Sequence, residues 1–523
     1  MCDKFHSNNS RRKTNVITVL LGLAGLTVSG CAVHGHKAFR PVSRNVYQRT
    51  GEHVHWNRRA RPSRRLQQRI ADLLRGPLTA RTAEKIALLN NPSLQATFAS
   101  VGVYQANLVQ AGLLANPIVF ATERFPNRPP SGVDAEEGVS EDLLSIVAMP
   151  LRKAVARDQL AATQLRVSDQ VLNLARDVKV AYYRYVGEAH LLNRMKLILR
   201  MDRIAGGVAA QQYRSGNISD LNYAQLEASY SQAVVNVSNA RLRLAADRQR
   251  LTRLMGLWGR QTAWKIPPHL SPVPAGRMDL PHLEAYAMKH RYSLQAQRKM
   301  ILALRTELRT GKAFRYFGLV EAGVNTEKFS GGQNITGPTV QATLPVFDQN
   351  QARIARVKYA VVQARQQLRA MAVRIRSRVQ EDEARLSAAR AEALYIGRVL
   401  MPQRVGVMHL SQQMYDGMLM GVYSLLLARH NEINAQRSYD RAWQDYFIAR
   451  ADLQRDVGGA LPKSFVYKPA KAHTVPQLLP RPHGPRTTYG TDQASAKMGG
   501  RKHRDKKGHG TGAGHAMPGM NMH

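Results

Sequence analysis

One proline-free stretch of the chain carries a seam of the kind that long coiled-coil helices share. Residues 151–266 contain no proline, and apolar side chains recur there at a spacing of seven. One row runs through Leu160, Val167, Leu174, Ala181, Glu188 and Met195, and an interleaved row runs through Gln164, Val171, Val178, Tyr185, Leu192 and Leu199. This seam predicts a helix near residues 151–205, about 80 Å long at 1.5 Å per residue. Helices in ordinary globular domains have about 11 residues, so we expect an elongated protein.

Three short motifs recur in the same order in the second half of the chain. Ser93–Ala96 returns as Ser293–Ala296, Gln211–Gly216 resembles Gln412–Gly417, and Met149–Leu151 resembles Leu344–Val346, at offsets of 200, 201 and 195 residues. Between the copies, Ile266–Pro274 contains four prolines and cannot continue a helix. We therefore expect two copies of one unit, 76–265 and 279–460, joined by a Pro-rich linker at 266–278.

Both copies follow one plan, which is mostly helical with a short β part. The predicted elements are a first helix (near 79–115 and 279–312), a β-hairpin (about 117–150 and 316–347), a very long helix (near 151–205 and 348–405) and a last helix (near 217–256 and 418–457). A turn at Gly216 or Gly417 precedes the last helix. The long helix of the second copy has a similar apolar spacing through Val357, Val361, Ala364, Leu368, Ala372, Ile375 and Val379.

The second hairpin alternates between apolar and polar residues. Val320, Ala322 and Val324 alternate with Glu321, Gly323 and Asn325, and Val340, Ala342, Leu344 and Val346 alternate with Thr339, Gln341 and Thr343. This pattern is typical of a membrane β-strand with one lipid face and one wet face, although a soluble hairpin would show it too. Four strands cannot close a barrel, and an open edge in lipid leaves backbone groups unpaired. A membrane location therefore requires several subunits to share one barrel.

The N-terminus is typical of an exported lipoprotein. Residues 1–30 have a basic start and an apolar run, Val16–Val28, that is too short to span a bilayer. The run ends in Ser29-Gly30-Cys31, and small residues before a cysteine resemble the lipobox of bacterial lipoproteins. That resemblance implies a covalent lipid on Cys31, and Ala32 after it implies the outer membrane. An ordinary signal peptide with a coincidental cysteine is the alternative.

Residues 70–460 resemble the TolC-like outer-membrane efflux family. The resemblance rests on the duplicated layout, on Leu344–Gln351, which looks like that family's strand-to-helix junction, and on Tyr213–Leu221, which looks like its helix turn at the periplasmic tip. It implies a homotrimer with a shared β-barrel and an α-barrel across the periplasm, docked to a periplasmic adaptor and an inner-membrane pump. It also implies a passive channel that has no catalytic residues and no cofactor.

The predicted tips differ from that family in one respect. Family members often carry acidic residues just after the second tip glycine, whereas Met418–Leu426 contains no carboxylate. Asp416, beside Gly417, and Asp220, near Gly216, are the candidates for a gate. Asp220 could instead simply cap its helix.

Residues 461–523 are rich in Pro, Gly, Lys and His, and we expect them to be disordered. Their end carries the candidate metal ligands His509, His515, Met517, Met520, Met522 and His523. Thioether and imidazole groups suit a soft cation such as Cu(I) or Ag(I), and similar clusters in copper-handling export systems point to heavy metal as the cargo by analogy. A tail without function is the alternative.

The formal charge of +40 falls to +37 without residues 1–30, which hold four basic groups and one acid. Such a charge suggests nucleic acid or an anionic membrane as partner. Arginines gather in the basic extension 31–75, but no nucleic-acid-binding fold accompanies them, and the export signal argues against such a role. We expect no nucleic acid partner and a solvated basic surface that touches outer-membrane lipid.

Two other classes of protein fit the sequence less well. A lipid-anchored periplasmic adaptor would share the lipobox and the long helices, but adaptors carry a lipoyl-like β-domain around a single helical hairpin. An enzyme is disfavoured, because the sequence has no Gly-x-Ser-x-Gly, no His-Glu-x-x-His and no Gly-rich phosphate loop.

Overall fold

The computed structural model describes residues 35–57, 63–125, 127–128, 132–276 and 282–459. All of them belong to one unit of the chain. The predicted signal segment 1–30, Cys31 and the candidate metal ligands of the tail lie outside the described residues. The predicted domain boundaries stay predictions.

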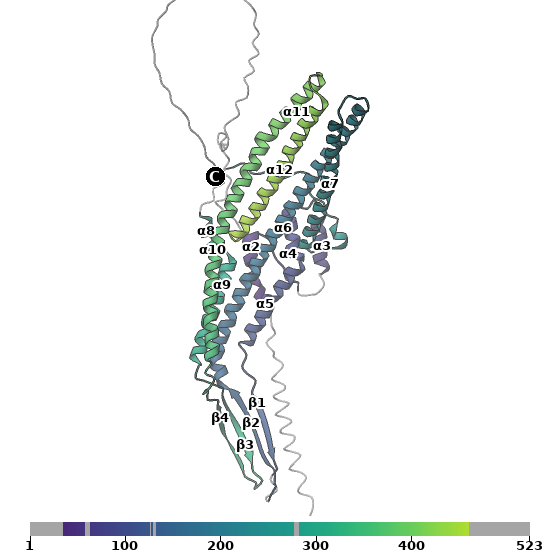
Figure 1. The fold of residues 1–523 in the computed structure, drawn as a ribbon. Coiled ribbons are helices and arrows are strands. Elements are labelled where there is room, and N and C mark those ends of the chain that lie inside the picture. The colour runs from purple at the N-terminus through teal and green to yellow at the C-terminus, as the bar shows by residue number, and fades with distance from the viewer. Residues whose placement is uncertain (1–34, 58–62, 126, 129–131, 277–281, 460–523) are drawn as a thin grey trace, which may run out of the picture. The chain divides into compact units, whose positions relative to one another are not determined.

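The described residues form long helices joined to one small sheet (Figure 1). The first part contains α2 (Gly35–Thr50), α3 (Arg64–Leu74), α4 (Ala80–Asn90), α5 (Pro92–Gln110), β1 (Ile118–Arg124), β2 (Asp134–Asp142), α6 (Leu143–Arg214), α7 (Asp220–Met255) and the 3-10 turn η1 (Gly259–Thr262). The second part contains α8 (Leu283–His290), α9 (Tyr292–Ala313), β3 (Val320–Lys328), β4 (Asn334–Ala342), α10 (Gln351–Tyr395), the π-helical turn η2 (Ile396–Leu400), α11 (Met401–Asp416) and α12 (Val422–Asp456). The order of helices and strands from α4 to α7 recurs from α8 to α12 when the consecutive segments α10, η2 and α11 are counted as one helix that corresponds to α6.

The predicted seam of the long helix is buried in α6. Leu160, Val167, Val171, Val178 and Leu192 are among its buried residues, and α6 packs along α7, α9 and α12. The corresponding seam of α10 is buried at Val357, Val361, Ala364, Ile375 and Val379. Burial of one apolar stripe per helix therefore holds the helices side by side.

The first hairpin is shorter than predicted, and α6 begins eight residues earlier than the predicted 151. The side chain of Asp142 accepts a hydrogen bond of 3.0 Å from the N–H of Ser145 and so caps the helix. Pro150, the residue before the predicted start, lies inside the helix. The apolar run before it is helical because this cap starts the helix at Leu143. In the second hairpin, β4 ends at Ala342, so Leu344 and Val346 lie beyond the strand.

The four strands form one antiparallel sheet in the order β1-β2-β3-β4. Val119, Val139 and Val324 are aligned across β1, β2 and β3. On the same face Ala322 pairs with Val340, while Glu321 pairs with Gln341 on the opposite face. The predicted division of the second hairpin into an apolar and a polar face is confirmed.

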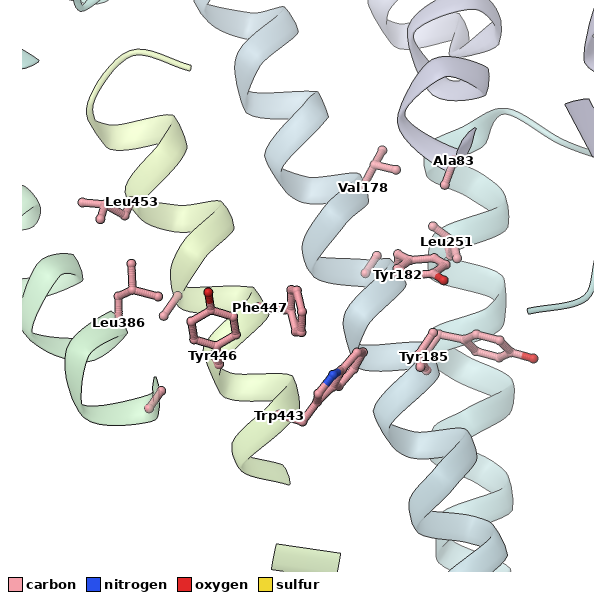
Figure 2. Close-up of a cluster of buried hydrophobic side chains, with 14 of the residues drawn as sticks. Ala83, Val178, Tyr182, Tyr185, Leu251, Leu386, Trp443, Tyr446, Phe447 and Leu453 are labelled. Carbon is pink, nitrogen blue, oxygen red and sulfur yellow. The ribbon is translucent and has the colours of Figure 1, made fainter. Parts of the chain in front are cut away.

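The largest core cluster lies where α6, α7, α10 and α12 meet. Trp443 and Phe447 of α12 lie on the side of that helix that faces α6 (Figure 2), where their rings contact Tyr183. The indole nitrogen of Trp443 donates a hydrogen bond of 2.7 Å to the carbonyl oxygen of Ser271, which ties the Pro-rich linker to the core. Removing such a side chain would cost about 3–5 kcal/mol of stability.

A second cluster attaches the N-terminal segment to the helices. Phe39, Val42 and Val46 of α2 are buried against α5 and α6, and the N-terminal end of α2 is fixed where Gln164 donates a hydrogen bond of 2.8 Å to the carbonyl oxygen of Ala38. The extension 31–75 was predicted only as basic, so the helices α2 and α3 are additions to that prediction. Among the described helices, none is long and apolar enough to cross a membrane.

Candidate functional site

Exposed apolar side chains gather where the strands meet the helices. They are Leu113 and Leu114 before β1, Leu143, Ile146 and Val147 after β2, Tyr316, Phe317 and Leu319 before β3, and Leu344, Val346 and Phe347 after β4. We call these residues the junction belt. Phe347 is the extreme case, because the residue is 93% exposed. Contiguous exposed apolar surface marks a contact with a membrane or a partner. Aromatic residues at the end of a sheet are typical of a membrane interface.

The sheet ends in two open edges. β1 and β4 each pair on one side only within the described strands. Such edges are templates for pairing with another chain. Neighbouring copies could satisfy both edges at once, β1 of one against β4 of the next.

The helix α7 carries a second seam besides the one it buries against α6. Its buried stripe includes Ala233, Val237 and Ala240. The exposed stripe also has heptad spacing, contains no charged residue and runs through Leu221, Ala224, Ala228, Ser231, Val235, Ser238, Leu242 and Ala245. An apolar stripe at this spacing is what a partner helix packs against. We call it the outer seam of α7.

A matching stripe lies on α11. Val407, Leu410 and Met414 follow one another at spacings of three and four, and each is exposed. α11 packs on α12, whereas α7 packs on α6. Figure 1 shows the α11–α12 hairpin and the α6–α7 hairpin extending to the same end. The two exposed stripes thus belong to different hairpins.

The two hairpin turns have the same hydrogen bonds but different residues at the strained position. In the first turn Gly216 has a φ of +73°, and the N–H of Asn217 donates to Gln212 O at 2.8 Å. In the second turn the N–H of Leu419 donates to Met414 O at 2.8 Å. The left-handed residue there is Met418, with a φ of +60°, whereas Gly417 has a φ of −80°.

The sequence alignment of Gly216 with Gly417 is therefore wrong by one residue. Met418 is the true counterpart of Gly216 in the turn. A left-handed conformation costs a non-glycine residue roughly 1–2 kcal/mol. Met418 is 94% exposed, so no buried contact offsets that strain within the described residues.

The candidate gate carboxylates are both exposed at the turns. Ser219, rather than Asp220, caps α7, since its side chain accepts a hydrogen bond from the N–H of Asn222. Asp220 occupies the first turn, where a negative charge suits the helix dipole, and its hydrogen bond with Tyr213 raises the pKa of that phenol. Asp416 ends α11 and accepts a hydrogen bond of 2.8 Å from Gln412.

Two polar contacts join the hairpins near their turns. Tyr423 at the start of α12 donates a hydrogen bond of 2.5 Å to Gln212 of α6. Further from the turn, His430 Nε2 lies 2.7 Å from Asp202 Oδ1, and Asp202 is buried. Sequence analysis missed both contacts, because nothing in the local pattern shows which residues of different repeats meet.

A buried charged cluster joins α10 and α12 within the helical layer. Nη1 of Arg291 and Nη1 of Arg455 lie 2.8 Å and 2.5 Å from Asp456 Oδ1. Asp382 hydrogen-bonds to Asp456, and only 6% of Asp382 is exposed. Burial and the neighbouring Asp456 raise the pKa of Asp382 to about 7. Burial alone would also raise the pKa of Asp456, but Arg291 and Arg455 lower it, so Asp382 is the member that holds a proton.

The described residues include no group of three or more His, Cys, Asp or Glu side chains arranged to hold a metal ion. The candidate ligands of the tail lie beyond them.

Solved structures of membrane proteins share this fold. A membrane protein from Pseudomonas aeruginosa matches with a TM-score of 0.60 at 17% identity, covering 72% of this chain and 93% of that chain. VceC, an outer membrane protein from Vibrio cholerae, matches with a TM-score of 0.60 at 16% identity, covering 77% and 100%. CusC matches with a TM-score of 0.60 at 14% identity, covering 73% and 92%.

No protein-family model and no curated protein matches the chain. At identities of 14–17% the likeness concerns the fold. It confirms the predicted fold, which is mostly helical with a small antiparallel sheet.

Proposed function

We propose that this chain is one subunit of a homotrimeric outer-membrane efflux channel. Its four strands contribute to a β-barrel that several copies share, and its long helices contribute to an α-barrel in the periplasm. The subunit conducts passively and catalyses nothing. A periplasmic adaptor and an inner-membrane pump deliver the cargo.

The observation that carries this proposal is that the sheet and the helical layer each have two edges without a partner in the single subunit. The sheet has an open edge at β1 and another at β4. The helical layer exposes the outer seam of α7 and the stripe of Val407, Leu410 and Met414 on α11. Head-to-tail contacts between unlike edges generate a closed ring when the rotation closes. A ring of copies would bury all four edges, and the junction belt would then lie at the membrane surface.

We propose that the two hairpin turns form the periplasmic end of this channel. The contact between Tyr423 and Gln212 holds one hairpin to the other in a closed arrangement. Asp220 and Asp416 are exposed at the turns and available to attract cations. The adaptor would meet this end, where Met418 and Leu419 are exposed.

Two further parts of the proposal concern segments outside the described residues. A lipid on Cys31 would anchor the subunit to the outer membrane. The tail ligands His509, His515, Met517, Met520, Met522 and His523 would bind Cu(I) or Ag(I) in passing, which makes heavy metal a candidate cargo. An adaptor role is less well supported, because the solved structures that share the fold are described as outer-membrane channels and outer-membrane proteins.

Blocking the outer seam tests the assembly. The double variant Val235→Glu/Leu242→Glu places two charges on an exposed stripe, so the single chain should keep its helix content. Burying two unpaired carboxylates between subunits costs several kcal/mol, so we expect the heat-modifiable trimer in outer-membrane fractions to be lost. Conductance of the purified protein in planar bilayers should disappear with it.

A matched control places the same two charges beside the seam. Gln225→Glu/Gln232→Glu alters residues that are also exposed on α7 but lie off both stripes. This variant should form trimers and conduct like the parent. A monomeric, non-conducting parent protein, or trimers in the seam variant, would contradict the proposed function.

A further inference from the structure

The prevailing sign of the charge changes from negative to positive where the strands end and the helices begin. The four strands hold eight acidic residues and two basic ones: Glu123, Asp134, Glu136, Glu137, Glu141, Asp142, Glu321 and Glu327, with Arg124 and Lys328. Just beyond the sheet, residues 143–158, 305–316 and 348–358 hold ten basic residues and only three acidic ones. The ten are Arg152, Lys153, Arg157, Arg305, Arg309, Lys312, Arg315, Arg353, Arg356 and Lys358, which we call the basic collar. All but the half-buried Arg315 are exposed.

The few carboxylates beside the collar are partly engaged. Asp158 lies 3.4 Å from Lys299, and Asp348 accepts a hydrogen bond from the N–H of Asn350. At the end of the sheet, Asp142 caps α6, and Glu321 accepts a hydrogen bond from Ser140. The positive charge of the collar is therefore largely unbalanced in the described part of the chain.

A cavity of about 550 Å³ opens within the basic collar. Its walls are the ends of α5, α6, α9 and α10 nearest the sheet, with apolar side chains such as Leu144, Val155, Phe314 and Ile354. Arg152, Arg353 and Glu307 are its charged lining residues. A volume of this size is in the range of ligand pockets.

The two arginines that line the cavity have N–H donors that form no hydrogen bond within the described residues. Arg152 donates one hydrogen bond of 3.0 Å, to the carbonyl oxygen of Ser145, and a guanidinium group has five N–H donors. Among the described residues, neither Arg152 nor Arg353 has an ion-pair partner. The cavity therefore offers two cationic groups and one carboxylate, Glu307, beside an apolar wall.

The order of surfaces along the chain matches the cross-section of a membrane leaflet. The sheet is followed by the apolar junction belt, and the belt is followed by the basic collar. Aromatic and apolar residues suit the boundary of the hydrocarbon layer, and arginine or lysine just beyond it attracts anionic headgroups. An amphipathic anion fits this order, whereas a free phosphate ion would make no use of the apolar wall.

We propose that the basic collar binds anionic phospholipid of the leaflet that faces the helices, and that the cavity holds one such molecule. Its phosphate lies on Arg152 and Arg353, which pair with phosphate oxygens as bidentate donors. Part of an acyl chain lies along Leu144, Val155 and Ile354. This inference rests on the proposed function, because it requires the sheet to cross a membrane.

The test measures lipid bound to the full-length protein in neutral detergent by native mass spectrometry. Phosphatidylglycerol should bind more tightly than phosphatidylcholine. In the variant Arg152→Gln/Arg353→Gln, the affinity for phosphatidylglycerol should fall about fivefold for each arginine, and so roughly 25-fold for the pair. The affinity for phosphatidylcholine should stay the same. Equal affinity for phosphatidylglycerol in parent and variant would overturn the proposal.

A matched control removes two arginines elsewhere. Arg200→Gln/Arg241→Gln changes exposed residues on α6 and α7, away from the collar, and should keep the parent's affinity. An equal loss in this control would mean that net charge, not the cavity, recruits lipid. Displacement of the lipid by millimolar inorganic phosphate would mean that the site takes a free ion.

Trimer formation and conductance are recorded on the same preparations. A conducting trimer without lipid preference would refute the inference and leave the proposed function standing. A non-conducting protein that still prefers phosphatidylglycerol would refute the proposed function and retain the lipid surface.

Discussion

The phenol of Tyr423 on α12 donates a hydrogen bond to Gln212 on α6, across 2.5 Å and between the two repeats. A single such bond contributes about 1 kcal/mol. If it holds the periplasmic end closed, Tyr423→Phe should raise the open probability in single-channel recordings about fivefold. Tyr415→Phe serves as control, because Tyr415 is exposed at the same turn. Equal open probabilities for Tyr423→Phe and the parent would rule out this bond as a closing contact.

The left-handed conformation of Gly216 and Met418 predicts that three substitutions at the turns differ in their effect on stability. Gly216→Ala should destabilise the protein by about 1 kcal/mol, because alanine does not favour a left-handed φ. Met418→Gly should stabilise it by a similar amount. Gly417→Ala should have little effect on the turn, because Gly417 has a φ of −80°. Denaturant unfolding of the three variants measures this. A large loss of stability in Gly417→Ala, with no loss in Gly216→Ala, would refute the assignment of Met418 as the counterpart of Gly216.

The carboxyl pair of Asp382 and Asp456 predicts how stability depends on pH. Asp382 ionises near pH 4 in the unfolded chain and at about pH 7 in the folded protein. Its contribution to stability is therefore fully present below about pH 4 and lost as the pH rises through about 7. Thermal unfolding between pH 5 and 8 should show this decline in the parent.

Asp382→Asn should flatten that decline, since asparagine can donate to Asp456 without a titrating proton. The variant should be less sensitive to pH and more stable than the parent above pH 7. Asp416→Asn is the control, because Asp416 is exposed at the turn, and it should keep the parent's slope. An unchanged slope in Asp382→Asn would show that other groups cause the decline.

The tail predicts a metal affinity that depends on sulfur. Titration of the full chain with Cu(I) under reducing conditions should show binding tighter than millimolar. Replacing Met517, Met520 and Met522 with leucine removes the thioether donors and keeps the side chains apolar, so the affinity should fall at least tenfold. Retained affinity would place the ligands elsewhere in the chain, and no affinity in the parent would refute a metal role for the tail.

The long seam could be predicted because heptad spacing depends on sequence alone. Leu160, Val171 and Val178 are buried as their spacing requires. The start of α6 could not be predicted from that spacing, because it depends on the cap that Asp142 provides. Phe39, Val42 and Val46 are spaced at three and four residues, so the helix α2 was detectable, but the surrounding basic residues and Pro41 obscured it.

The features that decide the candidate site come from contacts between distant residues. The outer seam of α7 has a readable spacing, yet only the structure shows that this face is exposed while the opposite face is buried. The sequence also aligned Gly216 with Gly417, because glycine is the usual left-handed residue of such turns. Backbone hydrogen bonds place Met418 there instead, and composition gave no signal of it.

The unlike edges of the subunit have a genetic consequence. In the proposed ring, each copy would use its β1 and α7 edge for one neighbour and its β4 and α11 edge for the other. A copy with charges on the outer seam of α7 keeps a normal α11 edge, so it can still join a growing ring but cannot complete it. Such a mutant gene should be dominant: produced in equal amounts beside the normal one, it should spoil most assemblies rather than half of them.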